Sequence, residues 1–144
     1  MTDCIRRRWR TLPPWARVLL VVTIGGFLEG TGAHALDLAR HGPHAYSSFA
    51  PPLQVFFVAL TVLDPLVAVL LLCARPAGVL LAAVVMTADA LGNWYVNWSW
   101  LRADWARLLH PVGMLPITLF ALFVLASAIP LARALTAPRP VPVG

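Results

Sequence analysis

Two long apolar runs follow each other in residues 53–98, LQVFFVALTVLDPLVAVLLLCARPAGVLLAAVVMTADALGNWYVNW, with only Ala74, Arg75 and Pro76 between them. Each run matches the ~20 residues that an α-helix needs to cross ~30 Å of hydrocarbon. Pro76 predicts the start of a second helix, because proline is tolerated in the first turn of a helix and not in its middle. The sequence therefore predicts two membrane-spanning helices joined by a tight turn.

The same pattern continues on both sides of this pair. The chain is 60% hydrophobic and 12% charged, whereas soluble domains average about 25% charged residues. Its mean hydropathy is +0.78. The predicted fold class is all-α, an integral membrane four-helix bundle. We expect a basic N-terminus at 1–14, one domain at 15–137 with helices at about 15–38, 53–73, 77–98 and 112–132, and a disordered Pro-rich tail at 138–144.

The distribution of arginine predicts the orientation of the chain. All eleven basic residues are arginines, which together with the Ala, Leu, Val and Pro content is typical of a GC-rich bacterial genome. One side of the predicted bundle carries Arg6, Arg7, Arg8, Arg10, Arg17, Arg75, Arg133 and Arg139, and the other carries Arg40, Arg102 and Arg107. Positive charge is enriched on the cytoplasmic side, so we expect both termini in the cytoplasm and a multi-pass protein of the plasma (inner) membrane. The net charge of +5 then indicates topology and contact with anionic headgroups, and no nucleic-acid partner is expected.

Three acidic residues, Glu29, Asp64 and Asp89, lie deep within three of the predicted helices. A charged side chain at the centre of a bilayer costs at least ~2.5–3.5 kcal/mol on insertion scales, so each acid is a candidate for a functional site. Asp64 and Asp89 lie at similar depths, and Glu29 lies at a comparable depth or slightly nearer the outer side. The sequence therefore predicts that these three carboxyl groups, the candidate catalytic residues, meet in one layer of the bundle.

Further polar residues continue the faces that carry two of these acids. Asp37 follows Glu29 at i+8 and Asn93 follows Asp89 at i+4, and a polar stripe on a lipid-embedded helix must face protein or water. Trp94 is typical of an interfacial aromatic belt, although it could also line a hydrophobic pocket. No closely spaced pair of histidines indicates a metal site, so neither a metal nor a cofactor is expected. The candidate ligand-binding residues are Asp37, His34, Asn93 and Trp94.

Two functions of different classes fit this pattern. In the first, the protein binds a membrane lipid or a small hydrophobic or amphiphilic ligand in an acidic intramembrane cavity. An isomerase of this kind would use one protonated carboxyl as general acid and an ionised neighbour to stabilise positive charge. In the second, the protein is a non-enzymatic accessory subunit or homo-oligomer whose buried acids hold the helices together. A proton or ion pathway is disfavoured, because the cytoplasmic half of the helices is almost purely apolar.

The order of short motifs also resembles a known group of proteins. The motifs are His34-Ala35-Leu36-Asp37, Pro51-Pro52, Asp64-Pro65, Arg75-Pro76, His110-Pro111 and Pro116. Over about residues 15–132 this order resembles the EXPERA group, which includes the sigma-2 receptor and, with an extra helix, emopamil-binding sterol isomerase. The resemblance implies an internal acidic cavity for sterols or amphiphilic amines, with Asp37 and Asp64 facing the ligand. For a bacterial protein it implies a polyprenoid or another lipid in place of a sterol.

Overall fold

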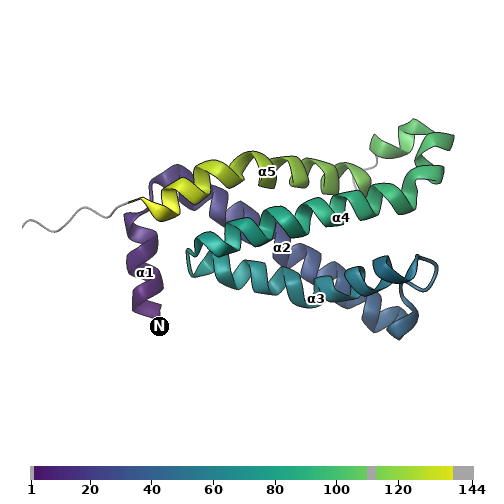
Figure 1. Cartoon of the computed structure of the whole chain (residues 1–144), viewed down its shortest axis with the longest axis horizontal. Coiled ribbons are helices and arrows are strands. Elements are labelled where there is room, and N and C mark those ends of the chain that lie inside the picture. Colours follow the sequence, from purple (N-terminus) through teal and green to yellow (C-terminus); the bar gives the residue numbers. More distant parts are fainter. Residues whose placement is uncertain (1, 110–112, 138–144) are drawn as a thin grey trace, which may run out of the picture.

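The computed structural model describes residues 2–109 and 113–137, and the described residues form an all-α bundle (Figure 1). Four long helices run along the bundle, and each is long and apolar enough to cross a membrane. This confirms the predicted class, a multi-pass membrane protein with four spans. The elements are α1 (Thr2–Thr11), α2 (Pro14–His41), η1 (Gly42–His44), α3 (Pro51–Leu72), α4 (Pro76–Ala103), η2 (Trp105–Leu109) and α5 (Met114–Thr136).

Proline and glycine set most of the helix boundaries. The helices α2, α3 and α4 each begin at a proline, where the missing N–H has no intrahelical partner to lose. The α2 helix ends at His41 and is capped by Gly42, whose positive φ of +63° suits glycine. The α4 helix continues to Ala103, past the expected end at 98. The expected start of the last helix at 112 and the tail at 138–144 lie outside the described residues.

Packing between the helices is uneven. The α2 helix packs most extensively against α3, and α4 against α5, whereas α2 and α5 contact each other sparsely. At the turn between α3 and α4, a Cβ on Gly78 would lie 2.9 Å from the backbone nitrogen of Leu71, so only glycine allows this approach. The interior is mostly apolar, with Thr23, Asp64 and Ser127 as buried polar residues. Its largest fully buried side chains are Leu20, Leu60, Leu71, Leu101, Leu131, Val67 and Thr23.

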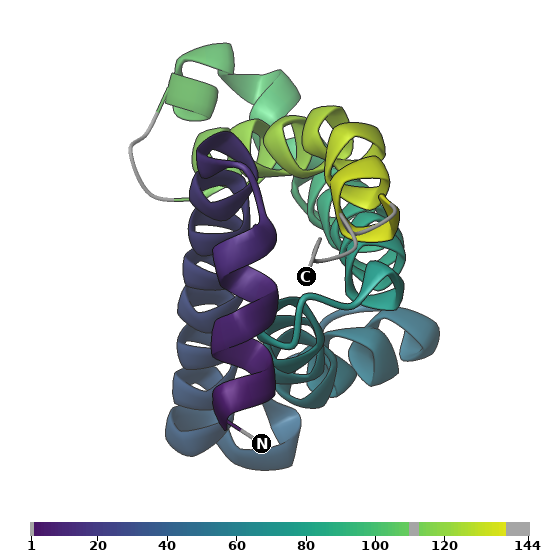
Figure 2. The same cartoon turned by 90° about the vertical axis from the view of Figure 1, so that its left-hand side faces the viewer.

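The basic N-terminal segment folds as helix α1, which crosses one end of the bundle (Figures 1 and 2). The Trp9 indole N–H donates to the Leu72 carbonyl at 2.7 Å, and Arg8 Nη1 donates to the Cys73 carbonyl at 3.1 Å. Arg17 donates to the Leu12 and Arg10 carbonyls, each at 2.9 Å. The last carbonyls of a helix have no intrahelical donor, so these side chains satisfy the C-terminal ends of both α1 and α3.

Aromatic side chains gather at the opposite end of the bundle, around η2. The Trp98 and Trp105 rings meet edge to face with centroids 5.8 Å apart. The Arg107 guanidinium lies 5.1 Å from the centroid of Trp100 and donates to the Trp100 carbonyl at 2.9 Å. With Trp9 at the α1 end, aromatic residues therefore lie at both ends of the four spans.

Candidate functional site

Asp64 lies in the interior of the bundle, on the side of α3 that faces α2. Its exposed fraction is 5%, and a Cβ on Gly30 of α2 would lie 2.9 Å from its Oδ2 atom. A glycine at this position therefore makes room for the carboxyl group between the two helices. Asp89 lies on α4, which also packs against α3. Two of the three acids that the sequence singled out thus lie on adjacent helices.

Asp89 is held by its own helix. Asn93 Nδ2 donates to Asp89 Oδ1 at 2.9 Å and to the Asp89 carbonyl at 3.0 Å. One turn further on, Asn97 Nδ2 donates to the Asn93 carbonyl at 2.9 Å. The predicted polar stripe of α4 is therefore a ladder of hydrogen bonds within the helix, which fixes one oxygen of the Asp89 carboxyl group and leaves the other available.

Glu29 lies on a different side of α2. It is exposed, and it lines a groove between α2 and α5 with a volume of about 370 Å³. Asp64, in contrast, lies against the side of α2 that faces α3. The structure therefore places Glu29 in a groove that neither Asp64 nor Asp89 lines, with Asp64 buried and Asp89 half-buried. The other residues that line this groove are Gly25, Gly26, Pro116, Ile117 and Phe120.

A second polar cluster links α2 to the segment between η1 and α3. The Tyr46 hydroxyl donates to Asp37 Oδ2 at 3.2 Å and lies 3.0 Å from His34 Nδ1. The Tyr46 ring stacks on Phe57, with centroids 5.4 Å apart. Burial, followed by the charge and hydrogen bond of Asp37 and the charge of Asp89, raises the pKa of Tyr46 to about 12. Tyr46 therefore remains a hydrogen-bond donor at physiological pH.

Sequence reasoning did not identify Tyr46. The signal available was weak, since a tyrosine in a short connection between two apolar runs is also typical of an interface. The structure shows that its exposed fraction is only 8% and that it joins His34 to Asp37, two of the candidate ligand-binding residues. These two residues are therefore tied into a cluster with each other through Tyr46.

Trp94 joins two of the membrane-spanning helices. Its indole N–H donates to Thr118 Oγ1 of α5 at 3.0 Å, and the Thr118 hydroxyl donates in turn to the Met114 carbonyl at 2.7 Å. Thr118 was also not identified from the sequence. The polar atom of Trp94 is thus engaged in the contact between α4 and α5. His110, from the motif His110-Pro111, lies outside the described residues.

The charged groups near Asp64 and Asp89 decide whether these carboxyl groups have a basic partner within the protein. In the described part of the chain, the one ion pair joins Arg107 to Asp104 at 3.8 Å, and it lies in the η2 region away from Asp64 and Asp89. No group of three or more His, Cys, Asp or Glu side chains among the described residues could hold a metal ion. Neighbouring carboxyl groups in an apolar interior need a proton or a cation between them.

No protein-family model, no curated protein and no solved structure matches this chain.

Proposed function

We propose that this membrane protein binds an amphiphilic ligand whose cationic head lies between Asp64 and Asp89. The observation that carries the proposal is the position of these two carboxyl groups, one buried and one half-buried, on adjacent helices without a basic partner among the described residues. The arginines of the sequence lie near the ends of the spans, far along the helices from both acids. A ligand cation would remove the repulsion between the carboxyl groups and offset the cost of burying them.

We propose that the ligand enters from the groove between α2 and α5, which Asp64 and Asp89 do not line. The two helices contact each other sparsely, and Glu29 is exposed in the groove between them. Gly26 lies in this groove and Gly30, one turn further along α2, adjoins Asp64. A cationic head that moves laterally out of the lipid would therefore meet Glu29 first and Asp64 next.

The hydrogen bonds argue against a purely structural role for the acidic pair. Acids that hold helices together need hydrogen bonds that cross from one helix to another. The Asp89 side chain accepts a hydrogen bond from Asn93 of its own helix, α4. Among the described residues, no hydrogen bond joins the Asp64 side chain to another helix. Asp37, in contrast, accepts a hydrogen bond from Tyr46 in the segment between η1 and α3. We therefore propose a structural role for Asp37 and a binding role for Asp64 and Asp89.

The EXPERA resemblance supports the same class of ligand, because it implies an acidic cavity that accepts amphiphilic amines. An isomerase would draw on the same two carboxyl groups, one as proton donor and the other to stabilise a carbocation. Binding of a cationic amphiphile is the simpler property, and both roles require it. A binding experiment therefore tests the proposal first.

The experiment uses the whole protein in lipid nanodiscs and spin-labelled stearylamine as probe. Electron paramagnetic resonance measures the immobilised fraction of the probe, with spin-labelled stearic acid as the oppositely charged comparison. We expect Asp64→Asn and Asp89→Asn to weaken stearylamine binding about tenfold or more, because each removes a charged hydrogen-bond acceptor from the cation.

The matched control is Asp104→Asn, which removes the same charge from an exposed residue in the loop after α4. This variant should bind the probe as the wild type does. Equal binding of stearylamine and stearic acid by the wild type, or unchanged binding by the double variant of Asp64 and Asp89, would refute the proposal.

A further inference from the structure

Helix α1 has two faces with different chemistry. Ile5, Arg8, Trp9 and Leu12 recur at helical spacing and are buried or half-buried against the bundle. The remaining arginines of this helix, Arg6, Arg7 and Arg10, are exposed. The Arg8 and Arg17 guanidinium groups donate to backbone carbonyls, whereas those of the three exposed arginines form no hydrogen bond or ion pair within the described residues.

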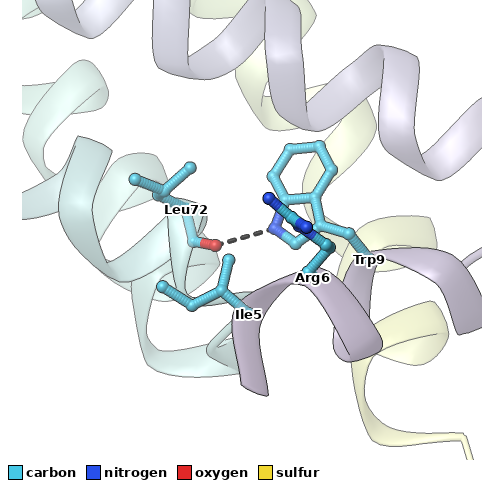
Figure 3. Close-up of a pocket in the computed structure, with 4 residues that line it drawn as sticks. All are labelled: Ile5, Arg6, Trp9 and Leu72. Atoms are coloured by element: carbon cyan, nitrogen blue, oxygen red, sulfur yellow. Dashed lines mark hydrogen bonds between the residues drawn. The ribbon is translucent and has the colours of Figure 1, made fainter. Parts of the chain in front are cut away.

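A pocket lies where α1 crosses the end of α3, and it combines one cation with apolar walls. It is lined by Ile5, Arg6 and Trp9 of α1 and by Leu72 of α3, and its volume is about 420 Å³. Figure 3 shows the side chains of Ile5, Arg6 and Trp9 gathered toward Leu72, with the hydrogen bond from the indole to the Leu72 carbonyl. This bond holds α1 in place and leaves the Arg6 guanidinium as the polar group available to a ligand.

An apolar track leads from this pocket along the outside of α3. Leu72 is exposed, and it is followed toward the middle of the helix by Val69, Leu66 and Val62, all exposed and spaced by three or four residues on one face. From Leu72 to Val62 the track covers ~15 Å, which is half the ~30 Å thickness of the hydrocarbon core. The track therefore has the length of an acyl chain in one leaflet.

We propose that this pocket binds an anionic phospholipid, with its phosphate on Arg6 and one acyl chain along Leu72, Val69, Leu66 and Val62. The planar guanidinium donates two parallel hydrogen bonds to phosphate oxygens. Arg10 lies one turn from Arg6 on the same face of α1 and adds positive charge beside the headgroup. Helix α1 then lies along the membrane interface, with its arginines at the level of the headgroups.

The test measures lipid binding to the whole protein by native mass spectrometry. The protein in mild detergent is titrated with phosphatidylglycerol and with phosphatidylcholine of identical acyl chains. We expect the wild type to prefer phosphatidylglycerol and Arg6→Gln to weaken its binding about tenfold. Arg7→Gln removes the same charge from α1 outside the pocket, and it should change binding by less than about twofold.

Two further measurements separate a lipid from a free phosphate group. Leu72→Ser retains the backbone carbonyl that Trp9 requires but removes the apolar wall, so it should weaken phosphatidylglycerol binding. Glycerol phosphate, the headgroup without acyl chains, should fail to displace the lipid. Equal weakening by Arg6→Gln and Arg7→Gln, or equal affinity of the wild type for the two lipids, would overturn the proposal and leave only a diffuse positive surface.

Discussion

The two sides of helix α2 differ in how they meet their neighbours. Toward α3 the contact is closed: Gly30 adjoins Asp64, and His34 and Asp37 are tied by Tyr46. Toward α5 the contact is sparse: Glu29 is exposed in a groove, and Gly26 lies tightly against the Phe120 ring. One helix thus presents acids and glycines on both sides, in two different environments.

This difference shows that the burial of an intramembrane acid depends on which neighbouring helix its side chain faces. Glu29 and Asp64 look alike in the sequence, as single acids within apolar runs. Their exposure separates them, since Asp64 is buried and Glu29 is open to the groove. The glycines differ in the same way, because Gly30 makes room for a carboxyl group and Gly26 for an aromatic ring.

Among variants on the two sides of α2, Gly26→Ala is expected to cause the largest loss in the free energy of unfolding. A Cβ at this position would overlap the Phe120 ring, which must then move. We expect the free energy of unfolding, measured by SDS titration in mixed micelles, to fall by about 1–3 kcal/mol relative to Gly25→Ala. Gly25 has open space around its Cβ position, so this control carries the same gain in helix propensity without the overlap.

Two further variants extend that measurement. Phe120→Leu should rescue Gly26→Ala, because a smaller side chain leaves room for the added methyl group. Gly30→Ala should cost less than Gly26→Ala, since the atom that it meets is the end of the Asp64 side chain. A cost for Gly25→Ala as large as that for Gly26→Ala would contradict the described contact between α2 and α5.

A medium effect is expected on the closed side from Tyr46→Phe. The variant removes the donor to Asp37 but preserves the ring against Phe57, so we expect a loss of about 0.5–1.5 kcal/mol in the free energy of unfolding. The pKa of Tyr46 is raised to about 12 in the folded protein, above the ordinary value of about 10. The stabilisation is therefore fully present below pH ~10 and is lost as the pH rises from about 10 to about 12.

Tyr46→Phe should lack the part of the fall in unfolding free energy between about pH 10 and pH 12 that comes from Tyr46. Denaturation curves measured at several pH values would show this. Tyr95→Phe is the matched control, because Tyr95 is 72% exposed. Tyr95→Phe should change the free energy of unfolding by close to zero. If Tyr95→Phe and Tyr46→Phe cost the same, the cluster around Tyr46 does not stabilise the closed side.

The smallest effect on stability is expected from Glu29→Gln. An exposed side chain without a described hydrogen bond should change the free energy of unfolding by less than about 0.5 kcal/mol. If the groove is the route to Asp64, the same variant should slow the association of spin-labelled stearylamine, because a charge at the rim acts mainly on the association rate. A change in stability comparable to that of Tyr46→Phe would show that Glu29 belongs to a closed contact.

Much of the fold could be predicted from the sequence. The four spans follow from the length of the apolar runs, and the starts of the first three follow from Pro14, Pro51 and Pro76. These signals are local, because hydrocarbon thickness and proline geometry act on one segment at a time. The helical N-terminus was not predicted, since its arginines indicated only topology and the partners of Arg8 and Trp9 lie at the end of α3.

The sequence by itself determined that the chain has four helices long and apolar enough to span a membrane and carries acids within three of them. Only the tertiary structure decided that Asp64 adjoins Gly30, that Glu29 lies in a separate groove, and that Tyr46 joins His34 to Asp37. The physical reason is that depth along a helix follows from residue number, whereas the direction in which a side chain meets another helix depends on how the helices are rotated and packed. Periodicity places Glu29 and Asp37 on one stripe, but it leaves open which neighbour that stripe will face.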